Sequence, residues 1–384
     1  MARAPSRAAA DTPAPEPDRV EGHPHPRETA ALYGQEAAER RFLDAWAGGR
    51  LHHAWLIRGP AGIGKATLAY RIARALIAQA PTGGLFGEPE TPPTLDAPEN
   101  DPVRQRIVAQ SEPRLFVLRR RPDDKGRLRT VITVDDVRAL RGFLGLSATD
   151  GGWRVVIVDP ADEMNRNAAN ALLKFLEEPP AQTVFLLISH APAGLLPTIR
   201  SRCRTLDLQP LGPVDLARAL GQAGAEIPAG AETALAELSG GSAGQALRLV
   251  AGDGLALYAR IVRLFEGGRG IDRGAMTDLA ERCAGRANAD TYRLLLQLTQ
   301  ILVARLARAA ATGAVPPEAA PGEAALIAAI ARTPRQAAPW AEALAVIGAT
   351  TRHAVAVNLD PAQTVLNTFL ELDATIGRVR AAAA

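Results

Sequence analysis

The chain has 384 residues, 47% of them hydrophobic, which allows a sizeable core and two or three domains and excludes a fibrous, disulfide-stapled or chiefly disordered protein. Its 44 basic residues nearly balance its 41 acidic ones, so the net charge of +3 gives no sign of a polycationic tail that binds nucleic acid or membranes. Only three of the basic residues are lysines, namely Lys65, Lys125 and Lys174.

The first 29 residues mix Ala, Pro and Arg with acids and lack the apolar segment of a secretion signal, so residues 1–29 are predicted to be a disordered leader. Residues 30–209 alternate short β-rich runs with helical stretches, the pattern of an α/β domain with a parallel sheet. The strands are expected at residues 54–58, 115–118, 131–134, 154–158, 184–189 and 205–208. Residues 80–102 are crowded with Pro, Gly and acids, which predicts a flexible insertion.

After Pro210 the β pattern fades, and Ala/Leu-rich helical segments separated by glycines predict an all-helical second half. Residues 291–310 carry their leucines on one broad stripe, as a half-buried helix does. Asp360 is placed to cap a helix that begins at Pro361 and is expected to bury Val365, Leu366, Phe369 and Leu370.

The strongest motif is Gly59-Pro60-Ala61-Gly62-Ile63-Gly64-Lys65, which lies between an apolar strand and an amphipathic helix. This is the phosphate loop G-x-x-x-x-G-K in its required context. Gly59, Gly62 and Gly64 let the backbone turn so that successive N–H groups converge on a phosphate, while Lys65 reaches the β and γ oxygens. The sequence therefore predicts a site for ATP.

Two positions indicate that this site is degenerate. Ala66 stands where a Ser or Thr hydroxyl would coordinate Mg²⁺, and Thr67, one residue further, points about 100° away around the helix. An apolar strand ends in Asp159, the acid expected to hold a metal through water, but Pro160 follows it where a Glu would orient the attacking water. We therefore expect impaired Mg²⁺ binding, since the nearby Asp162 is out of register with the position of the missing Glu. The alternative is that Asp159 is an ordinary carboxylate at the end of a strand, with no role in metal binding.

Four motifs together resemble those of AAA+ clamp-loader subunits. They are the phosphate loop, Leu32-Tyr33-Gly34-Gln35, Asn167 to Pro180 (N-A-A-N-A-L-L-K-F-L-E-E-P-P) and Ser201-Arg202-Cys203. The resemblance covers residues 32–251 and is looser beyond them. It implies an AAA+ P-loop sheet domain over residues 30–209, a helical lid over 210–252, and over 253–384 a helical collar that assembles with sister subunits into an open ring.

The resemblance also implies which residues act. Gly244 stands where a motor subunit carries the arginine of a G-S-x-R motif. At Ala66, Pro160 and Gly244 the chain therefore lacks three side chains that a motor subunit uses for ATP hydrolysis or nucleotide sensing. Arg202 survives, at the position from which the family directs an arginine finger to the neighbour's γ-phosphate. Ser189, at a strand end, occupies the position of a polar sensor. The alternatives are an Arg202 that pairs with a surface acid and a Ser189 that is an ordinary turn residue.

The implied protein is a subunit that lacks hydrolysis of its own and helps a clamp loader set the sliding clamp on primed DNA. Its implied partners are the other ring subunits, of delta and tau/gamma types, with the clamp and the DNA reached through the complex. An ATP-hydrolysing motor subunit is one alternative, and a nucleic-acid-binding helical protein with a relic nucleotide fold is another.

Cysteine usage bears on cofactors and compartment. Cys203 and Cys283 lie 80 positions apart with no Cys/His cluster, so we expect no zinc, no metal ligands and a reducing compartment, the cytoplasm. Some relatives carry a four-cysteine zinc module that residues 79–114 lack. No apolar run approaches the roughly 20 residues of a membrane span, and the closest, residues 294–304, contains three polar residues, so no membrane partner is expected.

Overall fold

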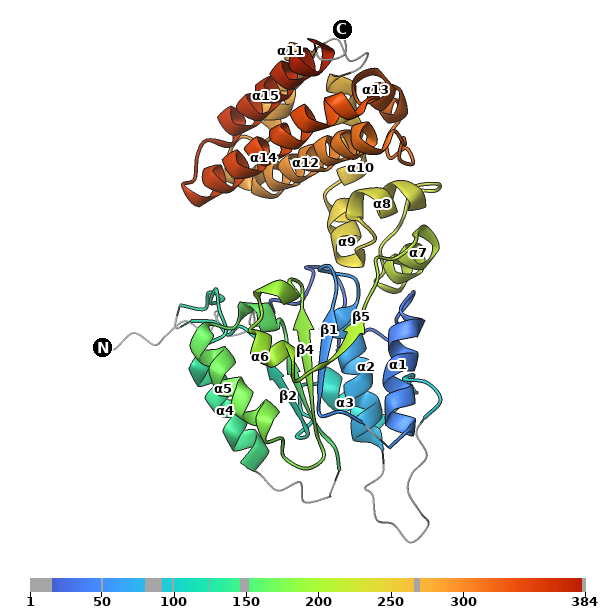
Figure 1. The fold of residues 1–384 in the computed structure, drawn as a ribbon, viewed down its shortest axis with the longest axis vertical. Coiled ribbons are helices and arrows are strands. Elements are labelled where there is room, and N and C mark those ends of the chain that lie inside the picture. Colours follow the sequence, from blue (N-terminus) through green and yellow to red (C-terminus); the bar gives the residue numbers. More distant parts are fainter. Residues whose placement is uncertain are drawn as a thin grey trace, which may run out of the picture. The chain divides into compact units, whose positions relative to one another are not determined.

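The computed structural model describes residues 16–49, 51–79, 92–98, 100–123, 125–145, 152–265 and 270–381. The chain divides into two compact units, Met1–Pro210 and Leu211–Ala384, whose elements are labelled in Figure 1. The further division of the second unit into a lid and a collar at residue 252 stays a prediction.

A five-stranded parallel sheet in the order β2-β3-β4-β1-β5 forms the centre of the first unit. Its strands are β1 (Ala54–Arg58), β2 (Leu115–Leu118), β3 (Arg154–Val158), β4 (Thr183–Ser189) and β5 (Arg204–Asp207). Strand β4 lies between β1 and β3, and Ser189 is paired in register with Arg58. Because all the strands run in the same direction, the carboxyl ends of β1, β4 and β3 meet at one edge of the sheet.

Helices cover both faces of this sheet (Figure 1). They are α1 (Glu36–Ala47), α2 (Lys65–Ala78), α3 (Pro102–Val108), α4 (Val134–Gly145), α5 (Arg166–Glu177) and α6 (Pro197–Arg200). Along β1, Trp55 and Ile57 join the core beneath α1 and α2, while Ala54 and Leu56 join the core beneath α4 and α5. Burial on both faces explains why the central strands β1, β3 and β4 are mostly apolar.

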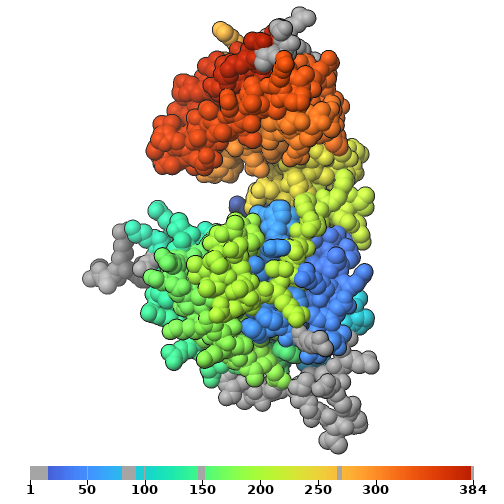
Figure 2. Space-filling view, viewed as in Figure 1, coloured from blue at the N-terminus to red at the C-terminus, as the bar shows by residue number. Residues whose placement is uncertain are grey.

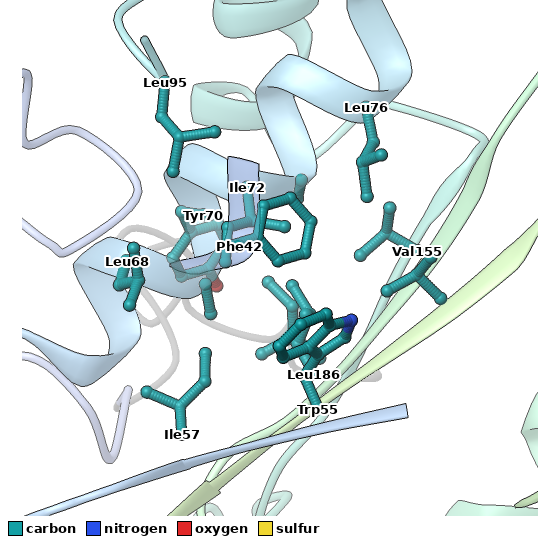
Figure 3. Packing of buried hydrophobic residues seen from close by; sticks show 14 of the residues in the cluster. Phe42, Trp55, Ile57, Leu68, Tyr70, Ile72, Leu76, Leu95, Val155 and Leu186 are labelled. Atoms are coloured by element: carbon teal, nitrogen blue, oxygen red, sulfur yellow. The ribbon is translucent and has the colours of Figure 1, made fainter. Parts of the chain in front are cut away.

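Figure 3 shows the first of these two cores. Phe42 of α1 packs against Trp55 of β1, with ring centroids 5.2 Å apart, and Leu76 of α2 belongs to the same cluster. The predicted α/β class, a parallel sheet domain followed by helices, is confirmed, and its assignment to the AAA+ group stays a prediction.

The strand predicted at residues 131–134 is wrong. Ile132 makes only a single bridge to Met164, and α4 begins at Val134. Thr133 supplies the reason, because its backbone N–H and its hydroxyl both donate to Asp136 Oδ2, at 2.9 Å and 2.7 Å. These two hydrogen bonds to Asp136 at the start of a helix outweigh the β propensity of the preceding residues.

The disordered leader predicted for residues 1–29 is wrong for residues 16–29, which we call the N-terminal strap; residues 1–15 lie outside the described part. The strap is held by Arg119, whose guanidinium donates to Glu16 Oε1 at 2.9 Å and to Asp18 Oδ1 at 3.0 Å. His25 is fully buried, with Nε2 2.9 Å from Asp18 Oδ2 and its ring edge-on to Tyr70 of α2. Composition missed this arrangement because the main partner lies about a hundred residues away.

The flexible insertion predicted for residues 80–102 is wrong for residues 92–98; residues 80–91 and 99 lie outside the described part. Leu95 is 1% exposed and belongs to the core beneath α2. The side chain of Asp96 accepts a hydrogen bond from Arg71 of α2 at 2.9 Å. One apolar residue and one ion pair therefore anchor this part of the segment.

The described residues of the second unit form helices. These are α7 (Pro213–Gln222), α8 (Glu232–Ser239), α9 (Ala243–Ala251), α10 (Gly254–Leu264), α11 (Arg273–Arg282), α12 (Ala289–Thr312), α13 (Glu323–Ile330), α14 (Pro334–Ala356) and α15 (Pro361–Ala381). In Figure 2 the orange and red segments of these C-terminal helices lie next to one another on the side shown.

Asp360 caps α15 as predicted, accepting from the Gln363 backbone N–H at 2.8 Å. Val365 and Phe369 are fully buried, but Leu370 is 45% exposed, so the prediction that it is buried is wrong. The buried stripe continues to Leu372, seven residues after Val365, which is two turns of helix. Leu370 lies about 140° around the helix from Val365, on the opposite side.

Among the described residues one helical segment, Arg286–Thr312, is long and apolar enough to cross a membrane, and 56% of its apolar window is buried inside the structure. Leu295, Leu298 and Leu302 form its buried stripe. A mostly buried apolar helix is also what the core of a helical domain contains.

Arg119→Met is expected to release the strap and to lower the free energy of unfolding by about 1–3 kcal/mol, because Glu16 and Asp18 lose a half-buried partner. Urea denaturation and hydrogen exchange of residues 20–28 would measure both effects. The matched control is Arg127→Met, an exposed residue of the same loop, which should change neither. Equal exchange in the two variants would contradict the role given to Arg119.

Candidate functional site

The loop between β1 and α2 has the backbone geometry of a phosphate loop. Gly59 and Gly64 adopt φ values of 147° and 98°, and Gly62 adopts 77°. A Cβ at Gly59 would lie 2.7 Å from the carbonyl oxygen of Leu208, and one at Gly64 would lie 2.5 Å from Leu32 Cδ1. Both positions therefore require glycine. No side chain caps the N-terminus of α2, which leaves its first N–H groups directed at the loop.

Lys65 is the first residue of α2 and is only 3% exposed. Its Nζ donates to the carbonyl oxygen of Gly59 at 2.7 Å and to that of Pro60. Burial lowers the pKa of the ammonium to about 8, against the opposing effect of the Asp159 and Asp162 carboxylates. The ammonium is thus satisfied by the loop's own carbonyls.

Asp159 directly follows β3 and is 4% exposed, at the same edge of the sheet as the loop. Its backbone N–H donates to Leu118 of β2 at 2.9 Å, which fixes its position. Burial raises the pKa of its carboxyl to about 7; Asp18 of the strap raises it further and Lys65 opposes the rise. Pro160 follows with no polar side chain and leads into the short helix η1 (Ala161–Glu163).

Ser189 ends β4 and is fully buried between the loop and Asp159, where the sequence placed a sensor. Its hydroxyl donates to Asp162 Oδ1 at 2.7 Å. The backbone N–H groups of His190 and Ala191 donate to the other oxygen of the same carboxylate, the second at 3.2 Å. Asp162, which the sequence placed out of register, therefore holds the end of β4.

These residues fit a phosphate and do not fit a metal ion. The glycine turns, the uncapped helix and Lys65 suit the phosphates of a nucleotide. Ala66 has only a methyl side chain, which cannot coordinate Mg²⁺. The next residue, Thr67 of α2, is buried and only 8% exposed. Among the described residues there is no group of three His, Cys, Asp or Glu side chains that could hold a metal.

Arg202 lies in the turn between α6 and β5. In the sequence it comes after α5, whereas the phosphate loop comes before α5. Its guanidinium donates to the carbonyl oxygen of Thr198 at 3.0 Å and pairs with Glu177 Oε1 at 2.9 Å. The side chain of Arg202 is 36% exposed and that of Glu177 48%. Glu177 is the last residue of α5, within the N-A-L-L-K-x-L-E-E-P-P segment, so two of the motifs meet in this ion pair.

Comparison with known proteins matches residues 34–212 to the family described as DNA polymerase III, delta subunit. Over 209 residues the chain is 44% identical to the DNA polymerase III subunit delta' of Pseudomonas aeruginosa, an alignment that covers 53% of this chain and 57% of that relative. Residues 34–212 are therefore similar to DNA polymerase III delta-prime subunits. The subunit delta' of Escherichia coli is 35% identical over 215 residues, covering 56% of this chain and 59% of the relative.

The chain thus spans less than two thirds of the length of these two delta-prime relatives. The matched residues 34–212 include the phosphate loop, Asp159, Ser189 and Arg202. Among solved structures, a DNA polymerase III gamma subunit-related protein from Thermotoga maritima covers 89% of this chain and 100% of its own, at 18% identity and a TM-score of 0.33.

The sequence did not predict three contributors to the site. Asp162 binds the end of β4, and Asp18 lies within electrostatic reach of Asp159. The side-chain amide of Gln35 joins the backbone of Gln209 through two hydrogen bonds of 2.7 Å and 3.0 Å, and so ties the start of α1 to the segment after β5. The role of Gln35 could have been suspected from the sequence, because Gln35 is the last residue of the motif Leu32-Tyr33-Gly34-Gln35.

Asp159→Asn is expected to flatten the pH dependence of stability between about pH 4 and pH 7. The raised pKa of the Asp159 carboxyl means that the folded state keeps a proton that the unfolded state has lost, so wild-type stability falls as pH rises through this window. At pH values above 7 the variant should be more stable by on the order of 3 kcal/mol, measured by urea denaturation.

The matched control is Asp135→Asn, which alters a carboxylate whose side chain is 75% exposed and should leave the pH profile as it is. A profile for Asp159→Asn that coincides with the wild-type profile from pH 4 to pH 8 would rule out the buried carboxyl as the source of the dependence.

Proposed function

We propose that this chain acts as the stator subunit of a bacterial clamp loader, helping to set a sliding clamp on primed DNA during chromosomal replication. The similarity of residues 34–212 to delta-prime subunits supports this role. The single observation that carries the finer proposal is that the chain combines an incomplete nucleotide site with a partly exposed Arg202. In the proposed division of labour, the chain triggers hydrolysis in a neighbouring subunit and performs none itself.

The composition of the site supports the absence of hydrolysis. Ala66 supplies no oxygen for Mg²⁺, and Pro160 supplies no base or hydrogen-bonding group to orient water. The Ser189 hydroxyl is engaged by Asp162. A nucleotide held by the glycine turns and Lys65 would lack the groups that activate the attacking water.

The surroundings of Arg202 support a finger that acts in trans. Its ion pair with Glu177 is partly exposed on both sides, and such pairs contribute only about 0–1 kcal/mol, so exchange for a phosphate oxygen costs little. An arginine finger stabilises charge that develops on the transferred phosphoryl group and contributes about 10³–10⁵ in rate. The planar guanidinium suits this task because it presents several donors in a fixed geometry.

The proposed partners follow from this role. They are a neighbouring motor subunit of tau/gamma type, which would receive Arg202, a delta-type subunit, and the clamp and primed DNA reached through the complex. The helical second unit, with its proposed lid at 210–252 and collar at 253–384, would hold the chain in the ring. A replication subunit of this kind would work in the cytoplasm.

Arg202→Ala is expected to leave the ring assembled and to lower its DNA- and clamp-stimulated ATPase rate about tenfold or more, because one site loses its finger. Gel filtration and a steady-state phosphate-release assay on the reconstituted complex would measure both. The control Arg204→Ala removes an exposed arginine two residues along the chain and should leave the rate unchanged. An unchanged rate for Arg202→Ala would refute the finger.

A motor subunit that hydrolyses ATP is the second candidate, because Lys65 and Asp159 occupy the positions that such an enzyme needs. The isolated chain distinguishes the two candidates: we expect no ATP turnover above the buffer background, in wild type and in Lys65→Ala alike. Turnover by the wild type that Lys65→Ala abolishes would establish the motor and remove the stator proposal.

A further inference from the structure

Three hydrogen-bond donors converge where β4 ends. They are the Ser189 hydroxyl and the backbone N–H groups of His190 and Ala191, and all three point at the two carboxylate oxygens of Asp162. Consecutive backbone N–H groups beside a hydroxyl form the kind of concavity in which proteins bind anions. In this chain the anion is a side chain of the chain itself.

The same carboxylate faces the phosphate loop. Asp162 and Asp159 are the two carboxylates that raise the pKa of the Lys65 ammonium, and Lys65 and Asp162 act with opposite sign on the pKa of His190. Asp162, Lys65 and His190 therefore lie within electrostatic reach of one another. Any phosphate that approached Lys65 along the edge of the sheet would meet a negative charge already held there.

The position of Asp162 results from local structure. The short helix η1 begins immediately after Pro160 and turns the chain back beneath the end of β4, so Asp162 is presented to Ser189. Ser189 is fully buried, whereas His190 and Ala191 are exposed, so the concavity is open to solvent on one side. A ligand could reach the three donors if the carboxylate were removed.

We propose that Asp162 is a resident anion of the phosphate-loop pocket: its carboxylate occupies the donors of the β4 end and so weakens the binding of nucleotide phosphates. The inference rests on the phosphate-loop pocket and is independent of the clamp-loader role. It assigns to Asp162 both the positioning of Ser189 and the selection against polyphosphate anions.

The direct test is Asp162→Ala in the full chain, with ATP and inorganic pyrophosphate as the two probes, in EDTA so that Mg²⁺ plays no part. Titration calorimetry should show both anions binding about tenfold or more tightly than to wild type, because one negative charge leaves and three donors become free. Asp162→Asn, which keeps an acceptor oxygen but loses the charge, should show an intermediate gain.

Two further variants separate this proposal from general effects of charge. Glu163→Gln removes the same charge one residue away, from a carboxylate that pairs with Arg120, and should leave both affinities at the wild-type level. Ser189→Ala combined with Asp162→Ala should lose much of the gain, because one of the freed donors is gone. Circular dichroism and urea unfolding verify that each variant is folded. If Asp162→Ala does not fold, Asp162→Asn is used for the binding test in its place.

The proposal is overturned if folded Asp162→Ala and Asp162→Asn bind both probes no more tightly than wild type, or if Glu163→Gln gives an equal gain. Weaker binding by Asp162→Ala would also overturn it, since Asp162 would then be a brace that the pocket needs. The stator role is measured on the ATPase of the assembled complex, so either proposal can fail without the other.

Discussion

The placement of β4 between β1 and β3, all three parallel, determines what the first unit can do. It brings the phosphate loop, Ser189 and Asp159 to one edge of a sheet that is buried on both faces. Charges collected at such an edge are costly unless each finds a partner. In this chain the partners belong to the chain itself. The Lys65 ammonium donates to carbonyl oxygens of the phosphate loop, and the Asp162 carboxylate accepts a hydrogen bond from the Ser189 hydroxyl. The same geometry that would serve a nucleotide thus serves the chain's own folding.

The strand pattern shows how far sequence reasoning reaches. Five of the six expected strands exist, and the three central ones, β1, β3 and β4, give the strongest local signal because they are apolar runs buried on both faces. Residues 131–134 have a similar composition, yet the Thr133 and Asp136 cap begins a helix there. The N-terminal strap was missed for a different reason, since its charges are neutralised by Arg119, and distance along the chain hides such a partner.

The site itself divides in the same way. The glycines, Lys65, Asp159 and Ser189 could be placed together from the sequence, because carboxyl ends of parallel strands share one edge. That Ser189 gives its hydrogen bond to Asp162 depends on the turn made by η1, which no residue spacing reveals. Likewise the sequence raised both possibilities for Arg202, and only coordinates show that its partner within the chain is Glu177.

The strap also has a consequence for synthesis on the ribosome. Arg119 follows Glu16 by 103 residues, so the strap cannot dock until β2 has been translated. At elongation rates of about 5–20 residues per second that interval is roughly 5–20 s. The strap is therefore made first but docks only after β2 has been translated, while β3, β4 and β5 are still to be made.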